Sequence, residues 1–506
     1  MTDEISARAA ASSIVQYFRI DGLHGYRSIS LESDYAATLL IAKNGSGKTT
    51  LLAALDAFLK GQFSRLKELR FTNIRCKLRN VETEIVLWSD DVAKYTSNAA
   101  IDAESRRLEI ETASLYLFLE EFTSNPDRPL GEDDLATTLV QKHGYSYSGV
   151  RSHCEKLKQV LYAESPAIRT IFSLLREALA DIEIVYLPTY RRIELAVNAR
   201  PDRYGRMRKQ VLPSQKSGLY SGDIQFGLSD VVDRLAQLNQ RIVTDSSLGY
   251  RELSASIINE LISGQFDRAD LTQDEIPDRA ELELFFSRLK DDRTRRQFGP
   301  HFELSIPNIA QIYQGAEGIS QESNKFLRYF LGKLNSVIRS TGEIEALVRD
   351  FIDNCNKYLS SVDISTTVHG RDLEPPSEGA MDGKVLTLSR RDLTISVDSL
   401  EVHRKIPLNS LSSGEKQMIS LFAKLYLYPK DKIILIDEPE LSLSIDWQRQ
   451  ILVDIVEAPL CRQVVAITHS PFVFDNSLEP FARPLTSTVD AYRASQVADD
   501  FEPDAS

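Results

Sequence analysis

Hydrophobic and polar residues alternate along the first part of the chain as half-buried β-strands require. The segments IVQYFRIDGL and YRSISL alternate around Gly22 and Gly25, and the apolar run TLLIA precedes a glycine-rich loop and a helix that begins near Lys48. Further strands are expected at 83–88, 107–111 and 181–188, with helices between the last two. The pattern predicts an α/β lobe over residues 1–195.

From residue 196 to 382 the pattern changes to long helices. The segments YRELSASIINELI and NKFLRYFLGKLNSVIRSTGEIEALVRDFIDNCNKYL have apolar residues at helical spacing, and joints such as LTQDEIPDRAE interrupt them. The spacing never holds a heptad over three or four repeats. We therefore expect a compact, mainly helical insertion and not a coiled-coil rod.

The last part of the chain returns to alternating strands and helices. The segment KVLTLSRRDLTISVD (384–398) is typical of a hairpin, and we expect a C-terminal lobe over 383–482. Residues 483–506 end in the acidic VADDFEPDAS, which predicts a flexible tail.

Length and composition narrow the class of protein. A chain of 506 residues with 42% hydrophobic and 26% charged residues is expected to fold as two or three globular units. Its net charge of −13 argues against a surface that binds nucleic acid throughout, but leaves room for a basic patch. No apolar run reaches the roughly 20 residues that span a bilayer, and the N-terminus lacks the apolar core of a signal peptide. We therefore expect a cytoplasmic protein with no membrane contact.

The cysteines lie too far apart to form a Cys-x-x-Cys pair. This spacing predicts neither a zinc site nor a disulfide framework, but reduced thiols in a core. The four are Cys76, Cys154, Cys355 and Cys461.

The loop AKNGSGKTT has the features of a phosphate-binding loop. Gly45 and Gly47 allow the backbone to turn its N–H groups onto phosphate oxygens, and Lys48 can reach the β- and γ-phosphates. The hydroxyl of Thr49 can bind Mg²⁺, and the positive end of the following helix attracts an anion. Ala42 replaces the usual first glycine, so a strand–turn–helix that merely uses glycine remains an alternative. The candidate nucleotide contacts in this loop are Lys43, Asn44, Gly45, Ser46, Gly47, Lys48, Thr49 and Thr50.

A second candidate site lies in DKIILIDEPELSLSIDWQ. The apolar residues 433–436 predict a strand buried on both faces, and Asp437 and Glu438 follow at its C-terminal end, where open α/β sheets bind ligands. Asp437 suits a water-mediated Mg²⁺ partner, and Glu438 suits a group that polarises attacking water. An ordinary solvated turn could carry the same two carboxylates.

Two further segments hold polar residues at helix and strand ends. In LNSLSSGEKQMISLF, Ser413 and Gly414 stand at a predicted helix start, where serine is common for structural reasons alone. In QVVAITHSP, a buried strand ends in Thr468 and His469, and a single histidine there is also common without function.

Together, in this order, the segments resemble the ABC-type ATPase heads of the RecF, Rad50 and SMC group. The elements AKNGSGKTT, LSSGEKQ, IILIDEPE, LSLSID and ITHSP correspond to the Walker A, signature, Walker B, D-loop and H-loop motifs. Ser413 precedes Asp437 by 24 residues, and His469 follows Asp437 by 32. The resemblance implies a mixed β-sheet with flanking helices and an antiparallel β subdomain, in two lobes separated by an insertion.

The resemblance also implies ATP and Mg²⁺ as ligands. Lys48 and Thr49 would bind phosphate and Mg²⁺, and Asp437 would support the metal. Glu438 would be the catalytic base, and His469 would sense the γ-phosphate.

In such heads the signature residues act on a neighbouring subunit. Ser413 and Gly414 would complete the nucleotide site of a second copy, so the active unit would be a homodimer. The resemblance allows a hexameric ring as well.

Within this group, several segments are similar in style to stand-alone ATPases of bacterial anti-phage systems. These are YLPTYRRIE (186–194), IQFGLSDVV (224–232) and DEPELSLSIDWQ. Such ATPases are relatives of the OLD family, in the AAA_15 and AAA_21 group, and those of the PARIS and Septu systems are the suggested matches. Arg191 and Arg192 would leave a strand tip near the nucleotide, although an exposed basic turn is equally consistent.

OLD-type nucleases carry a Toprim domain after the head. Only 35 residues follow Pro471, too few for a Toprim domain, and they contain no Asp-x-Asp pair. We expect that the nuclease is a separate Toprim-type effector, held by the ATPase and released when a phage-encoded trigger is sensed.

A basic stretch over 191–216 contains eight lysines and arginines against two acids. It could contact DNA phosphates or an acidic partner such as a phage protein that mimics DNA, or it could be a solvated loop. A RecF-like DNA repair ATPase is the alternative function. A transporter ATPase is disfavoured, because exporters carry a shorter, uninterrupted head.

Overall fold

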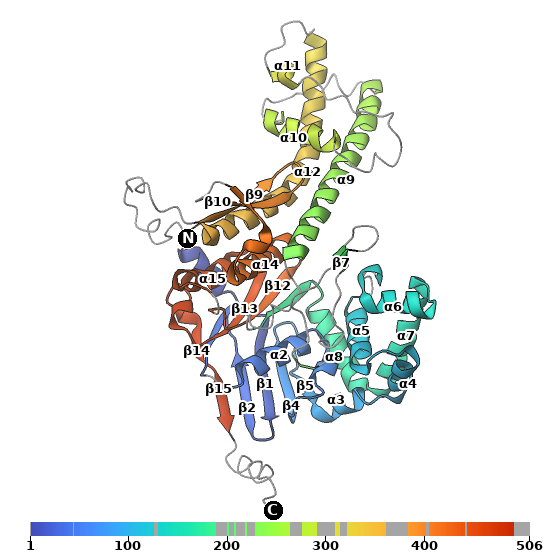
Figure 1. Cartoon of the computed structure of the whole chain (residues 1–506), viewed down its shortest axis with the longest axis vertical. Helices are drawn as coiled ribbons and strands as arrows, with labels where there is room; N and C mark the ends of the chain where they lie inside the picture. Colours follow the sequence, from blue (N-terminus) through green and yellow to red (C-terminus); the bar gives the residue numbers. More distant parts are fainter. Residues whose placement is uncertain are drawn as a thin grey trace, which may run out of the picture. The chain divides into compact units, whose positions relative to one another are not determined.

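The computed structural model describes thirteen stretches of the chain in two compact units (Figure 1). The described residues are 2–43, 45–125, 130–188, 200–201, 207–208, 218–219, 228–263, 276–290, 309–313, 321–360, 383–400, 404–440 and 443–489. Unit 1 comprises residues 1–225 and 429–506, and unit 2 comprises residues 226–428. The expected C-terminal lobe, 383–482, is thus shared between the two units.

A five-stranded parallel sheet joins the two ends of the chain in unit 1. Its order is β14-β3-β13-β12-β6, and every neighbouring pair is parallel. The strands are β3 (Ala37–Ile41), β6 (Ile182–Leu187), β12 (Asp431–Asp437), β13 (Cys461–Thr468) and β14 (Ala482–Pro484). Burial on both faces explains the unbroken apolar runs of β12 and β13, and it confirms the strands expected there.

A second five-stranded sheet in unit 1 is antiparallel, with the order β15-β2-β1-β4-β5. Its strands are β1 (Val15–Leu23), β2 (Arg27–Glu32), β4 (Asn73–Leu78), β5 (Ile85–Trp88) and β15 (Thr486–Val489). The buried side chain of Gln463, in β13, links the two sheets. Its Oε1 accepts from Ile14 N (2.9 Å) and Val15 N (2.8 Å), and its Nε2 donates to Val15 O (3.0 Å).

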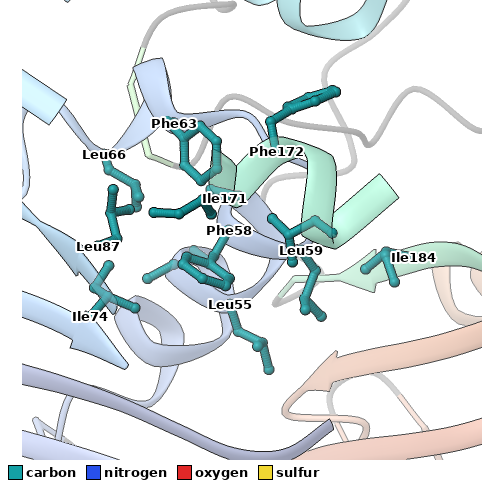
Figure 2. Close-up of a cluster of buried hydrophobic side chains, with 14 of the residues drawn as sticks. Leu55, Phe58, Leu59, Phe63, Leu66, Ile74, Leu87, Ile171, Phe172 and Ile184 are labelled. Carbon is teal, nitrogen blue, oxygen red and sulfur yellow. The ribbon is translucent and has the colours of Figure 1, made fainter. Parts of the chain in front are cut away.

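Helix α2 (Lys48–Leu59) is buried on almost every side, as a helix that is apolar all round must be. Figure 2 shows part of its apolar surroundings, to which both sheets, the short η1 helix (Phe63–Leu66) and helix α8 (Pro166–Ala178) contribute. The labelled side chains are Leu55, Phe58, Leu59, Phe63, Leu66, Ile74, Leu87, Ile171, Phe172 and Ile184. This packing fixes the start of α2, and so the loop before it, against the parallel sheet.

Other helices surround the sheets of unit 1. They are α1 (Thr2–Ala9), α3 (Ser89–Tyr95), α4 (Ala99–Leu108), α5 (Thr112–Ser124), α6 (Asp134–His143), α7 (Tyr147–Glu164) and α15 (Ile445–Glu457). Two short strands, β7 (Arg200–Pro201) and β8 (Met207–Arg208), pair antiparallel. The helices expected before residue 181 are confirmed in α7 and α8. The strand expected at 107–111 is wrong, because α4 continues to Leu108 and ends at Glu109, whose φ of 53° is left-handed.

Unit 2 is built on two long helices that lie side by side (Figure 1). Its elements are α9 (Leu228–Ile262), α10 (Arg279–Lys290), α11 (Ile309–Tyr313), α12 (Gln321–Leu359), β9 (Lys384–Ser389), β10 (Thr394–Ser399), β11 (Arg404–Ile406) and α14 (Ser413–Leu427). The predicted hairpin is confirmed as β9–β10. The helices of 35 and 39 residues are longer than a compact insertion implies, at about 50–60 Å each.

Two expectations from composition can be compared with the described residues. None of the described helices is long and apolar enough to cross a membrane. All four cysteines are free thiols, of which Cys76, Cys154 and Cys355 are buried.

Candidate functional site

The glycine-rich loop connects the end of β3 to the start of α2. Gly45 and Gly47 have φ angles of 77° and 90°, in the left-handed region that favours glycine. A Cβ at Gly45 would meet no atom within 4 Å, so its backbone conformation, and not lack of space, accounts for the glycine. Arg27 of β2 also holds the loop, because its Nη1 donates to Gly45 O at 2.9 Å.

Ala42 does not disturb this turn. It is buried, and its N–H donates to Thr468 O at 3.2 Å, which continues the pairing of β3 with β13. Ala42 does not have a positive φ, so its backbone needs no glycine. The left-handed turns of the loop lie further on, at Gly45 and Gly47.

The loop and the two carboxylates expected at the end of β12 lie together. Lys48 Nζ is 2.8 Å from Glu438 Oε1, and Thr49 Oγ1 donates to Asp437 Oδ2 at 2.6 Å. These partners are 390 and 388 residues apart in the chain. They meet because β3, β13 and β12 are parallel, so their carboxyl ends share one edge of the sheet.

Asp437 is almost completely buried at this edge. Burial raises the pKa of its carboxyl to about 6, although the hydrogen bond from Thr49 acts in the opposite direction. Its Oδ1, like Ser46 Oγ, is buried without a hydrogen-bond partner among the described residues. Such oxygens are costly unless a ligand or a cation completes their bonding. The pair Asp437 and Thr49 therefore fits a site for Mg²⁺.

Glu438 has a backbone conformation that a residue with a side chain rarely adopts. Its φ is 54°, in the left-handed region, and its N–H donates to Ile467 O at 2.8 Å. Strain of this kind costs on the order of 1–3 kcal/mol and tends to occur where function requires it. Its carboxylate thereby lies against Lys48.

His469 follows β13 at the same edge of the sheet. Its Nδ1 is 2.9 Å from Glu440 Oε1 and 3.7 Å from Glu438 Oε1. Glu440, which is buried, also accepts hydrogen bonds from His469 N (3.0 Å) and Thr468 Oγ1 (2.8 Å). Sequence reasoning gave Glu440 no role, and the only signal was a further carboxylate within the DEPE segment.

The other candidates of the loop lie at its two ends. Lys43 is exposed, Thr50 is part of the first turn of α2, and Asn44 lies outside the described residues.

The signature candidates belong to unit 2, which is described separately. Ser413 is the first residue of α14, and Gly414 is buried in its first turn. Ser412 is the N-cap and forms a capping box with Glu415, whose carboxylate also pairs with Lys384 at 2.9 Å. The helix start expected here is confirmed.

Several predicted features fall on parts of the chain that the structure does not describe. They are Arg191, Arg192, most of the basic stretch 191–216, residues 441–442 of the D-loop segment and the tail from residue 490.

Comparisons with known proteins agree with an ATPase head. The family model AAA_21, described as "AAA domain, putative AbiEii toxin, Type IV TA system", matches residues 198–475, more than half of the chain. A second model, AAA_23, described as an AAA domain, matches residues 18–127. Among curated proteins, none matches the chain.

Solved structures of Smc heads are also similar. One is the Smc head domain with an extended coiled coil bound to the C-terminal domain of ScpA, from Pyrococcus furiosus. It is 12% identical in sequence, with a TM-score of 0.34, and the match covers 96% of this chain and 98% of that chain. Another is the SmcHead bound to the C-winged helix domain of ScpA: 11% identity, TM-score 0.33, and 96% and 100% covered. At these TM-scores the likeness is loose and supports no further step.

The fold is that of an ABC-type ATPase head, in which a parallel sheet carries a glycine-rich loop after one strand and paired acids after another, next to an antiparallel sheet. The match to a family model over residues 198–475 identifies the family of the chain, which the fold alone does not do. This chain belongs to the AAA_21 family of AAA-domain ATPases.

Proposed function

We propose that the carboxyl edge of the parallel sheet binds and hydrolyses ATP, and that hydrolysis controls a partner effector in anti-phage defence. The pairing of Lys48 with Glu438 and of Thr49 with Asp437 carries the first half of this proposal. A triphosphate bound at the loop would compete with Glu438 for Lys48. Glu438 would then be released from its ion pair to polarise the attacking water.

The oxygens of Thr49 and Asp437 at this edge of the sheet suit Mg²⁺ that is bound partly by nucleotide and water. They are too few to hold a metal ion by protein side chains alone. No group of three or more His, Cys, Asp or Glu side chains in the described ranges could hold a metal ion by itself. Mg²⁺ is commonly held by one or two protein oxygens together with phosphates and water. Thr49 Oγ1 and the unpartnered Asp437 Oδ1 would supply the protein side, and the ion would offset the charge that develops on the phosphates.

His469 and the signature residues complete the proposed site. His469, about half exposed at the edge of the sheet, would contact the γ-phosphate. Ser413 and Gly414, at the N-terminus of α14, would contact the nucleotide of a second copy, since the first turn of a helix offers N–H groups to anions. Hydrolysis would then require a homodimer, and a hexameric ring of such dimers is an extension of the same proposal.

The biological role is proposed from resemblance. The segments similar to anti-phage ATPases suggest AriA of the PARIS system, and next PtuA of the Septu system. The description of the AAA_21 family names a toxin of a toxin–antitoxin system, which fits an ATPase that acts with a toxic partner. We propose that this partner is a separate Toprim-type nuclease, held by the ATPase and released by a phage trigger. An acidic, DNA-mimicking trigger would suit the basic stretch 191–216.

Two experiments test the two halves. For the composite site, Lys48→Ala protein is mixed with Ser413→Arg protein, and we expect each variant to be inactive alone. A mixed dimer has one intact interface, so we expect partial recovery of ATP hydrolysis. No recovery at any mixing ratio, with both variants folded and able to associate, would contradict the shared site.

For defence, the chain is expressed with its neighbouring gene in bacteria challenged with phage. We expect protection that is lost with Lys48→Ala, and co-purification of the chain with the neighbouring protein. Tight, salt-sensitive DNA binding that appears only with ATP, without protection, would instead favour a RecF-like repair ATPase.

A further inference from the structure

Glu440 follows β12 and has a buried carboxylate. Both of its oxygens contact residues at the end of β13. Its Oε2 accepts from Thr468 Oγ1 at 2.8 Å, and its Oε1 accepts from His469 N at 3.0 Å and lies 2.9 Å from His469 Nδ1. Glutamate is rarely buried unless its charge is engaged. All of these contacts converge on the residues that present His469.

We propose that Glu440 is a positioning residue that orients His469 for ATP hydrolysis and holds its Nδ1 nearer to Glu440 than to Glu438. This inference rests on the proposed ATPase site. A carboxylate accepts hydrogen bonds, so Nδ1 of His469 carries the proton and Nε2 is left for the ligand.

The distances indicate what Glu440 prevents. His469 Nδ1 lies 3.7 Å from Glu438 Oε1, within ion-pair distance, but nearer to Glu440 Oε1 at 2.9 Å, and without Glu440 the pair with Glu438 would tighten. Such a pair would occupy the carboxylate that is proposed to polarise water. Glu440 therefore has two effects: it sets the orientation of the ring, and it leaves Glu438 to Lys48 and the substrate.

Neighbouring groups hold Glu440 and the histidine turn together. Gln448 Oε1 accepts from Ser470 Oγ at 2.9 Å, and Gln448 Nε2 donates to the backbone oxygens of Glu440 (3.3 Å) and Leu443 (3.0 Å). Ser470 N donates to Thr468 Oγ1 at 3.0 Å. The turn after β12 and the turn after β13 are thus joined by side chains on both sides of His469.

The test compares ATP hydrolysis by wild type, Glu440→Ala, Glu440→Gln, His469→Ala and the double variant Glu440→Ala/His469→Ala. We expect Glu440→Ala to lower kcat by about 10- to 100-fold, as the loss of a supporting hydrogen-bond partner commonly does, with KM for ATP within about twofold. Glu440→Gln should retain most activity, because its amide oxygen can still accept from Nδ1. The double variant should be no slower than His469→Ala, since Glu440 acts through the histidine.

Two results would overturn the positioning role. One is a normal kcat for Glu440→Ala. The other is a double variant that is slower than His469→Ala by the full factor of Glu440→Ala. Asp475→Ala is the matched control, because this exposed acid of the same unit pairs with Arg449 at the surface and should leave kcat unchanged.

A second readout needs no ATPase activity. In protein with ¹⁵N-labelled histidine, the His469 signals, assigned by their loss in His469→Ala, should report a protonated Nδ1 in wild type and a changed tautomer balance in Glu440→Ala. An unchanged spectrum in folded Glu440→Ala protein would overturn the contact. If wild type hydrolyses no ATP, the proposed function fails while the spectrum still tests the contact. If wild type is active and Glu440→Ala equally so, the function stands and the positioning role fails.

Discussion

Two clusters of buried carboxylates in the described part of unit 1 differ in whether basic side chains pair with their aspartate. Next to α2, Asp56 pairs with Arg65 at 2.6 Å and with Lys60 at 2.7 Å, and Glu120 of α5 accepts from Ser64 Oγ at 2.6 Å. At the edge of the parallel sheet, Asp437 has a buried oxygen without a partner among the described residues. In the first cluster Asp56 Oδ1 and Arg65 Nε are likewise buried without a hydrogen bond, but Lys60 Nζ lies 2.7 Å from that oxygen. Basic side chains of its own neighbourhood therefore close this cluster around Asp56.

The two clusters also differ in backbone geometry. Glu438 has a left-handed φ of 54°, whereas Asp56 lies within the regular helix α2, and Glu120 lies within α5. An incomplete, strained cluster at the end of parallel strands is suited to a ligand. Burial of a carboxylate alone therefore does not identify a site, and the lack of a basic partner together with backbone strain is the more specific sign.

The largest effect is expected at Glu438, in the cluster that also contains Asp437. Its substitution should affect ATP hydrolysis but not ATP binding. Glu438→Gln keeps a side chain of the same size but removes the group proposed to polarise water, so we expect ATP hydrolysis to fall by about 10²- to 10⁴-fold. ATP binding should persist and should stabilise the dimer, because bound nucleotide is not consumed. Single-turnover hydrolysis and light scattering with ATP would measure both. A normal hydrolysis rate would show that Glu438 is not the base.

Substitutions in the closed cluster, which contains Asp56, Arg65 and Glu120, should lower the free energy of unfolding and leave ATP hydrolysis unchanged. Arg65 is 2% exposed and donates to Asp56, to Gln62 Oε1 (2.6 Å) and to Leu219 O (2.9 Å). Arg65→Met leaves the buried Asp56 with less compensation, so we expect the free energy of unfolding to fall by about 3 kcal/mol in urea titrations. KM for ATP should not change.

A second substitution checks the cause of that loss. Adding Asp56→Asn to Arg65→Met removes the poorly compensated charge, so part of the stability should return. If the double variant is less stable by the sum of both losses, the ion pair is not the source.

Sequence reasoning succeeded where the signal was local. The apolar run of β12 predicted a buried strand, and Gly45 and Gly47 do adopt the left-handed turns expected of them. It failed at 107–111, where five alternating residues imitate a strand but Glu109 caps a helix. Alternation over so short a segment cannot be told from the end of an amphipathic helix.

Specific contacts between segments far apart in the chain could not be predicted from the sequence. The segments suggested that Lys48 and Glu438 share a site, but not that they form an ion pair across 390 residues. Glu440 and Gln463 show the same limit, because a buried carboxylate or amide acquires its role only from partners that the fold supplies. The N-cap of α14 is a smaller case, since Ser412 and not Ser413 makes the capping box.

The closed cluster should also make the stability of the protein depend on pH, through Glu120. Burial raises the pKa of Glu120 from 4.5 to about 8, against hydrogen bonds from Ser64 and the charge of Arg65. Between these two pH values the folded chain keeps a proton that the unfolded chain releases. The free energy of unfolding therefore falls as pH rises from about 4.5 to about 8.

Glu120→Gln should remove this fall. Urea titrations at pH 6, 7 and 8 should show the variant gaining stability relative to wild type at each step. Glu104→Gln is the matched control, because hydrogen bonding to Arg107 lowers the pKa of Glu104, so its contribution is complete by pH 6. A constant difference between Glu120→Gln and wild type over this range would show that Glu120 is ionised in the folded protein.

The smallest expected effect concerns Ala42, the position where many phosphate-binding loops have glycine. Because Ala42 is buried, bonded to Thr468 O and without a positive φ, restoring glycine removes a buried methyl group and adds freedom to the unfolded chain. We expect Ala42→Gly to lower the free energy of unfolding by about 1 kcal/mol and to leave the Kd for ATP within about twofold. Gly45→Ala is the contrasting variant, since its φ of 77° is strained for alanine, and it should weaken ATP binding more than it lowers stability. Equal effects of the two variants on the Kd would show that the first position of the loop shapes the phosphate site as much as its left-handed turns do.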